Sequence, residues 1–176
     1  GGIVGKRITF DLDVATFFGT GADPGNSFVQ AGITIGGNTT LVRNDQATGT
    51  GDYFAVHFVE DTCCGAGNII QFFDGTPADP FNPGEFEFAL PLQTHANPAG
   101  AGPFSVQLDI DDPTDGDPWD GSGQTDISVS VNGSLIGSHS IGGGGLSNNF
   151  ITLSGTRDLL SQNLVTHAFD NLTVHA

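Results

Sequence analysis

The chain lacks methionine entirely and is poor in basic residues, with only Lys6, Arg7, Arg43 and Arg157 against 20 acidic side chains. Its formal net charge at pH 7 is therefore −16. A surface this acidic repels phosphate backbones and anionic lipids, which argues against nucleic acids and membrane surfaces as partners and makes cations the natural counterparts. The sequence also has no apolar run that approaches the length of a membrane span.

The absence of methionine indicates that the chain is not a complete primary translation product, so a front segment has been removed or a domain excised. Together with the acidity and the scarcity of lysine, this favours an extracellular or cell-surface protein. Three glycosylation sequons, at Asn38, Asn132 and Asn171, would carry glycans only in a host that modifies them.

Cysteine is also scarce, and the two that occur, Cys63 and Cys64, are adjacent. Their Cα atoms are about 3.8 Å apart across a trans peptide, which is shorter than in ordinary disulfides. A strained vicinal disulfide, two free thiols and bonds to other chains all remain open. A zinc site is a poor interpretation, because no second cysteine or histidine pair follows at ligand spacing.

Turn-forming residues are abundant, since 27 glycines and 9 prolines separate short apolar runs. This pattern predicts one domain over residues 1–176, an all-β antiparallel sandwich with about eleven strands and almost no helix. Most of the 14 phenylalanines fall on the apolar faces of these strands and are expected in the core. The expected strands are Ile3–Val14, Phe28–Ile35, Thr40–Arg43, Tyr53–Glu60, Asn68–Phe73, Phe86–Leu92, Phe104–Ile110, a hairpin over Asp126–Ser140, Phe150–Leu153 and Phe169–Val174. Residues 93–103 are expected to form a loop, and residues 157–163 one or two helical turns.

The run from Tyr53 to Glu60 alternates clearly, with Phe54, Val56 and Phe58 on one face of the expected strand. His57 falls on the opposite face. A lone histidine in such a place is more often a structural or surface residue than a ligand, and we expect one of those two roles.

The last third of the chain carries a recognisable succession of motifs. The run DISVSVNGSLIGSHSI begins at residue 126, NFITLSG follows, and FDNLTV ends at residue 174. This succession resembles the end of concanavalin A-like and laminin G-like jelly rolls, where a hairpin is followed by a strand and a closing strand. The resemblance implies a jelly roll and says little about activity, because the family includes lectins, glycan-binding modules, glucanases and structural domains. Several of its members bind calcium through loop aspartates.

An acidic loop between two expected strands is the most unusual stretch. Residues 109–126 hold 7 of the chain's 17 aspartates and no lysine or arginine. Calcium takes six to eight oxygen ligands, so the expected ligands are Asp109, Asp111, Asp112, Asp115, Asp117 and Asp120. The spacing is not that of an EF-hand, because Pro113 stands third from Asp111 and no glutamate closes the loop; a solvated acidic loop is the alternative. A weaker candidate for the same ion is the stretch with Asp74, Asp79, Asn82 and Glu85.

A glycoside hydrolase needs two carboxylates that face the scissile bond. Glu85 and Glu87 share a strand face, as in the glucanases of the resembled family. The position of the general acid, however, is held by Ala89 or Leu90, which cannot transfer a proton. No other catalytic motif occurs, so we expect a non-catalytic protein.

Two other functions are therefore considered besides the glycoside hydrolase. The first is a calcium-stabilised subunit that self-assembles or adheres outside the cell, as part of a filament, matrix or surface layer. Residues 1–14 would then be exchanged or donated as a strand to a neighbouring copy, through Ile8, Phe10, Leu12 and Val14. The second is a calcium-dependent carbohydrate-binding module, with Trp119 of the acidic loop as the stacking ring and Tyr53 as the only other amphipathic ring.

Overall fold

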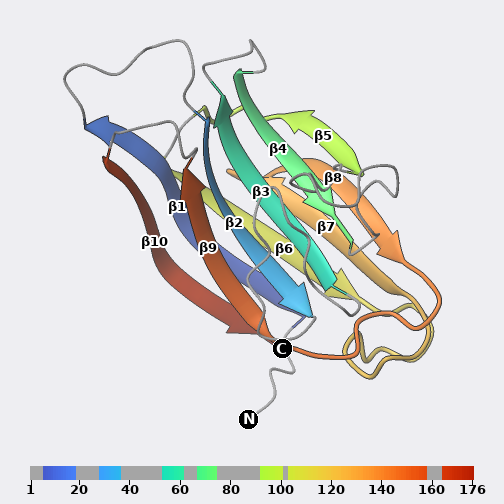
Figure 1. Cartoon of the computed structure of the whole chain (residues 1–176). Helices are drawn as coiled ribbons and strands as arrows, with labels where there is room; N and C mark the ends of the chain where they lie inside the picture. The colour runs from blue at the N-terminus through green and yellow to red at the C-terminus, as the bar shows by residue number, and fades with distance from the viewer. Residues whose placement is uncertain are drawn as a thin grey trace, which may run out of the picture.

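The structure is a computed structural model that describes residues 6–18, 28–36, 53–61, 67–74, 92–100, 103–157 and 164–176. These residues form ten strands and no helix (Figure 1). The strands are β1 (Arg7–Phe18), β2 (Phe28–Gly36), β3 (Tyr53–Asp61), β4 (Gly67–Phe73), β5 (Gln93–Ala96), β6 (Phe104–Asp111), β7 (Thr125–Val131), β8 (Ser134–Ile141), β9 (Ile151–Arg157) and β10 (Leu164–His175). A search of the described residues for a helix long and apolar enough to cross a membrane finds none.

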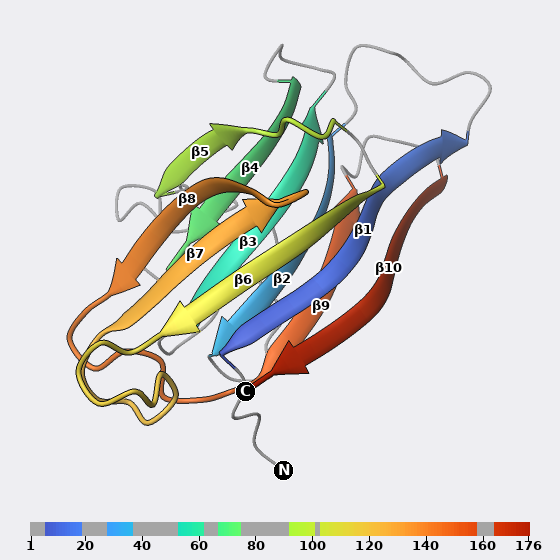
Figure 2. The same ribbon diagram turned by 180° about the vertical axis from the view of Figure 1, so that it is seen from behind.

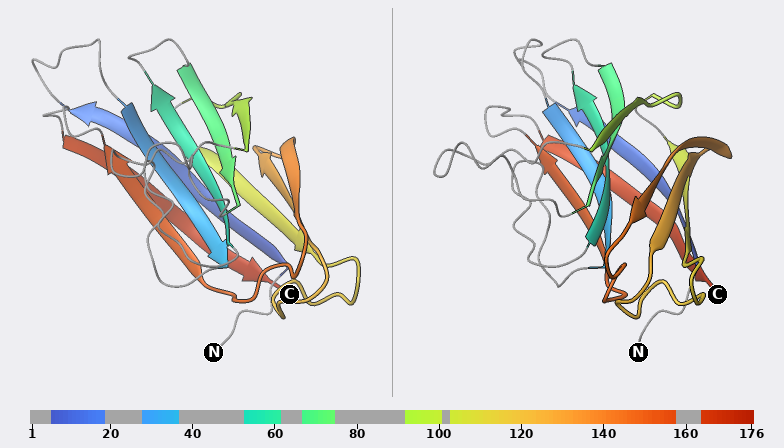
Figure 3. Two further views of the ribbon diagram at one scale, coloured as in Figure 1. Left: turned by 45° about the vertical axis from the view of Figure 1, so that its right-hand side comes forward. Right: turned by 90° about the vertical axis from the view of Figure 1, so that its right-hand side faces the viewer.

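The ten strands make two five-stranded antiparallel sheets. Sheet A has the order β10-β1-β6-β7-β8, and sheet B has the order β5-β4-β3-β2-β9. Figure 2 shows sheet A in front of sheet B, and Figure 3 shows the two sheets as separate layers. The prediction of an all-β sandwich is confirmed for the described part of the chain.

The core lies between the sheets, because each strand turns alternate side chains toward the other sheet. In β6 the side chains from Phe104 to Ile110 alternate between buried and at least partly exposed, as a half-buried strand requires. The rings of Phe58 in sheet B and Phe104 in sheet A are 5.2 Å apart between centroids, so phenylalanines join the two layers. Burying a side chain of this size contributes about 1.5–3 kcal/mol.

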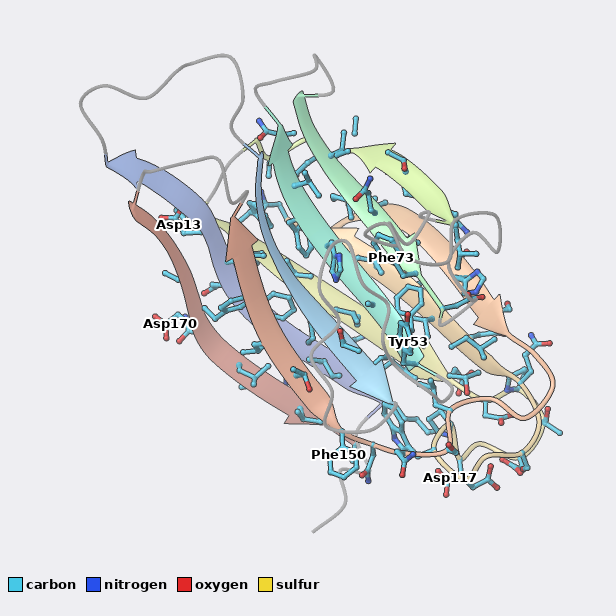
Figure 4. All side chains as sticks on the ribbon, in the orientation of Figure 1. Asp13, Tyr53, Phe73, Asp117, Phe150 and Asp170 are labelled. Carbon is cyan, nitrogen blue, oxygen red and sulfur yellow. The ribbon has the colours of Figure 1, made fainter. Side chains whose placement is uncertain are left out.

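Strand β3 is buried on both of its faces. Phe54, Val56 and Phe58 belong to the core between the sheets, as predicted. On the opposite face Tyr53 is buried with Phe73, and His57 is fully buried as well. Figure 4 labels Tyr53 and Phe73 on this second apolar face of sheet B.

Several boundaries differ from the sequence-based expectation. Strands β1 and β9 continue past their expected ends at Val14 and Leu153, to Phe18 and Arg157. Residues 93–96, expected in a loop, form the short edge strand β5, whose polar alternation gives only a weak strand signal. Strand β10 begins at Leu164, several residues before the expected Phe169. The expected strand at 40–43 and residues 86–91 of the strand expected at 86–92 lie outside the described residues. Residues 158–163 of the expected helical turns lie outside them too, and Arg157, expected to begin those turns, belongs to β9.

Strand β1 lies inside sheet A and pairs along both edges with strands of the same chain. Arg7 stands opposite Asp109 of β6, and Ile8 stands opposite Val174 of β10. Ile8, Phe10 and Leu12 are buried in the core, and Val14 lies in the part of β1 whose side chains are not described. Because both edges of β1 are occupied within the chain, the expectation of a donated N-terminal strand has no support in this fold, and residues 1–5 lie outside the described part.

Candidate metal centre

The acidic loop joins β6 to β7 at one end of the sandwich, beside the connection from β8 to β9 (Figures 1 and 2). A buried hydroxyl fastens the two segments together. Thr125 Oγ1 donates to the carbonyl of Pro118 at 3.1 Å and accepts from the backbone N–H of Leu146 at 3.0 Å. The backbone N–H of Gly121 donates to the Leu146 carbonyl at 3.0 Å. The base of the loop is therefore held at fixed points on the sandwich.

The aspartates themselves fold the loop. Four of them share one arrangement, in which a carboxylate oxygen accepts a hydrogen bond from the backbone N–H two residues later, as in Asx turns. The pairs are Asp112 with Thr114, Asp115 with Asp117, Asp117 with Trp119, and Asp120 with Ser122, at 2.6, 3.0, 3.1 and 2.8 Å. Each aspartate in these turns uses one oxygen on the backbone, which leaves the second oxygen for another partner.

Three of the carboxylates converge. Asp112, Asp115 and Asp120 each offer an oxygen, and these oxygens all lie within 4.8 Å of one another. The hydroxyl of Ser122 lies 3.2 Å from Asp115 Oδ2 and 2.9 Å from Asp120 Oδ2. The cluster thus combines three carboxylates and one hydroxyl, all of them hard oxygen donors.

Asp112 is the unusual member of this cluster, because only 3 % of its surface is exposed. Its Oδ2 atom is buried and has no hydrogen-bond partner in the described part of the chain. An ionised oxygen that is withdrawn from water and left unpaired is costly, unless a cation binds it. Gly123 has a φ of +68°, and a Cβ there would lie 2.8 Å from this oxygen, so only glycine leaves the approach clear.

The pKa of Asp112 shows that this carboxylate is ionised at neutral pH. Burial raises the pKa, but hydrogen bonds from the backbone N–H groups of Thr114 and Asp115 outweigh burial. The hydroxyl of Thr114 and the backbone of Gln124 act in the same direction without reaching hydrogen-bond geometry at Oδ2. The pKa therefore lies below the ordinary aspartate value, and the site keeps its negative charge for a metal.

The other three expected ligands lie elsewhere. Asp109 is on β6, where its Oδ1 is 2.5 Å from Arg7 Nε, and Asp111 pairs with Lys6 at 3.6 Å. Asp117 is exposed at the outer end of the loop, as Figure 4 shows. The structure therefore brings together three of the six aspartates, and neither Ser122 nor Gly123 was expected to take part.

The two rings expected to stack on a glycan are both buried. Trp119 is 9 % exposed and belongs to the core between the sheets, and Tyr53 is 2 % exposed. Neither ring offers a face to solvent, so the expectation of carbohydrate binding through them has no support. Trp119 instead packs into the core and anchors the acidic loop to the sandwich.

Other expected sites are only partly described. Asn132 at the tip of the β7–β8 hairpin and Asn171 in β10 are exposed, with φ values of 49° and 53°. Asp74 Oδ2 lies 3.0 Å from His139 Nε2 and is not part of a metal cluster among the described residues. The remaining candidates lie outside the described residues: Asn38, Cys63, Cys64, Asp79, Asn82, Glu85 and Glu87.

Comparison of the chain with protein-family models, with curated proteins and with solved structures returned no match.

Proposed function

We propose that this chain is a non-catalytic extracellular β-sandwich that binds calcium at Asp112, Asp115 and Asp120 and acts in self-assembly or adhesion. The observation that carries the proposal is the buried, unpaired Oδ2 of Asp112 beside two further carboxylates. Without a cation, three neighbouring negative charges repel one another and one of them has lost its water.

Calcium is the ion that suits these donors best. Only carboxylate and hydroxyl oxygens are present, which disfavours zinc and other metals that prefer nitrogen or sulfur. Two of the carboxylates are exposed, so water can complete a coordination shell of six to eight oxygens. Magnesium demands a stricter octahedral geometry and gives up its water reluctantly.

The bound ion would stabilise one end of the sandwich. The loop that supplies the ligands is fastened through Thr125 to Leu146, in the connection that carries the chain from sheet A to sheet B. A cation that neutralises the loop therefore also stabilises this crossing point. In calcium-rich surroundings outside the cell, the loaded form would be the working form.

We infer further that the sandwich is a jelly roll of the concanavalin-like type. The support is the order of the strands, in which the first and last strands are neighbours and the chain passes between the sheets four times. The hairpin β7–β8, the following β9 and the closing β10 contain the motifs on which the resemblance rests.

Self-assembly draws its support from the open edges of the sheets. Strand β10 is 12 residues long and lies at the edge of sheet A, where it exposes Leu172 and Val174. Among the described residues no further strand pairs with this edge, and an edge of this length is a template for a strand of another copy. Copies with a net charge of −16 repel one another, and divalent cations reduce that repulsion.

Calorimetric titration with calcium tests the site directly. Asp120→Asn removes one charge from the cluster, and we expect at least a tenfold loss of affinity, equivalent to about 1.4 kcal/mol. Asp117→Asn is the matched control, because it removes the same charge from the same loop outside the cluster and keeps an oxygen for the Trp119 N–H. Its affinity should fall clearly less than that of Asp120→Asn, because the Asp117 carboxylate does not contact the ion.

Thermal denaturation and sedimentation complete the test. At calcium concentrations about 100 times the dissociation constant, binding adds about 2.7 kcal/mol, which should raise the Tm of a chain of this size by several degrees. Calcium should also increase the sedimenting mass, and chelator should reverse the change. A wild-type protein that gives no binding heat and no shift in Tm with calcium has no such site.

A further inference from the structure

The chain's single lysine lies over the acidic loop. The backbone of Lys6 is held between two strands of sheet A, because its N–H donates to the carbonyl of His175 at 2.6 Å and its carbonyl accepts from Ile110 at 2.8 Å. Its side chain reaches the loop, where Nζ lies 3.6 Å from Asp111 Oδ1. Lys6 thus brings a positive charge to the loop itself, while Arg7 pairs with Asp109 on β6, before the loop begins.

Gly116 makes room for the ammonium group. Lys6 Nζ is 3.7 Å from the point that a Cβ on Gly116 would occupy, and Gly116 directly follows Asp115 of the metal cluster. The φ of Gly116 is +89°, and its N–H donates to the carbonyl of Asp112 at 3.0 Å. The ammonium is therefore next to the backbone that joins two of the three proposed ligands.

The contact between Lys6 and Asp111 is loose enough to be reversible. The two side chains are 48 % and 67 % exposed and line a shallow surface depression of about 480 Å³. An exposed ion pair of this kind contributes little stability, and water screens it. The ammonium can remain at the loop or move into solvent without disturbing the core.

We propose that Lys6 is an internal counter-ion of the acidic loop, which competes with the divalent cation and so sets the affinity of the site. The inference rests on the proposed calcium site. In the metal-free protein the ammonium reduces the repulsion among the loop aspartates. When calcium binds, the same ammonium repels the ion, so part of the binding free energy is lost.

This role predicts two effects of opposite sign for Lys6→Met. Calcium should bind about three- to fivefold more tightly at low salt, because one positive charge within about a Debye length of the ion has been removed. The metal-free protein should at the same time become less stable, since the loop loses its counter-ion. If Lys6 merely positioned Asp111 for the loop, Lys6→Met should instead bind calcium more weakly than wild type.

The matched control is Arg7→Met. This variant loses the same charge from the neighbouring residue, but Arg7 pairs with Asp109 on the outer face of sheet A. Lys6→Arg keeps the charge, and Lys6→Gln repeats the loss of charge with a polar side chain. All four variants replace a side chain that is about half exposed, so the packing of the core should not change. Urea unfolding in chelator checks that each variant folds.

Calcium titrations of the five proteins at 20 mM and 500 mM salt decide the matter. We expect Lys6→Met and Lys6→Gln to bind more tightly than wild type at low salt, Lys6→Arg and Arg7→Met to stay close to wild type, and the difference to shrink at high salt. If wild type binds calcium but the Lys6 variants bind equally or more weakly, the counter-ion role is wrong and the calcium site stands. If wild type does not bind calcium, both proposals fail.

Discussion

Acid should destabilise this protein through one histidine, His57, in the middle of β3. The side chain is fully buried, and its ring centroid is 4.7 Å from that of Phe73. Burial lowers its pKa from 6.5 to about 3, because the charged imidazolium loses its water. Folded His57 is therefore neutral at every pH at which the protein is expected to work.

The size of the effect follows from proton linkage. The folded pKa of His57 is depressed, so its contribution to stability is fully present above pH 6.5 and is lost as the pH falls towards 3. Within this window the unfolded chain holds one proton more, and each pH unit costs about 1.4 kcal/mol. From pH 6.5 to pH 5 the loss is about 2 kcal/mol, a large share of the 5–15 kcal/mol that typically separates folded and unfolded states.

Urea unfolding at pH 7, 6 and 5 measures this loss, in chelator so that calcium does not contribute. Wild type should lose about 2 kcal/mol over this range, and His57→Leu should lose markedly less, whatever its stability at pH 7. His175→Leu is the control, because it removes an exposed histidine and leaves the buried ring of His57 in place. Equal pH dependence in wild type and His57→Leu would refute the argument.

Two further substitutions test packing. In Gly32→Ala the new Cβ would lie 2.6 Å from both a ring carbon of His57 and a backbone carbonyl, so we expect a loss of about 1–3 kcal/mol in thermal or urea unfolding, and an unchanged midpoint would show that β2 can shift. Thr125→Val keeps the shape but leaves the carbonyl of Pro118 and the N–H of Leu146 without their partner, which should cost about 1–3 kcal/mol of unfolding free energy; a neutral result would mean that the loop is not fastened there.

The second half of the fold follows closely from the sequence, because its strands are exposed on one face. Alternation in β6 and β7 marks the buried side chains directly. The Asn132-Gly133 pair predicts the hairpin turn, and both residues have the positive φ values, 49° and 77°, that such a turn requires. In these strands the alternation of the sequence matches the alternation of buried and exposed side chains, so the hairpin and its core face could be predicted.

The candidate site was harder to predict, because a loop has no fixed period. Sequence spacing identified the acidic stretch but not which carboxylates converge, since that depends on the successive Asx turns. The inward direction of Trp119 depends on how the loop is anchored to Leu146, which lies in a distant part of the chain. The position of Lys6 beside the loop could not be predicted for the same reason, since Lys6 is more than a hundred residues from the loop in the sequence.

The central place of β1 has a consequence for how the molecule is made. The partner of Arg7 in β6 is Asp109, and the partner of Ile8 in β10 is Val174, so β1 can complete its place in sheet A only with strands that lie far along the chain. Non-local pairing of this kind slows folding and leaves an apolar strand exposed on the nascent polypeptide.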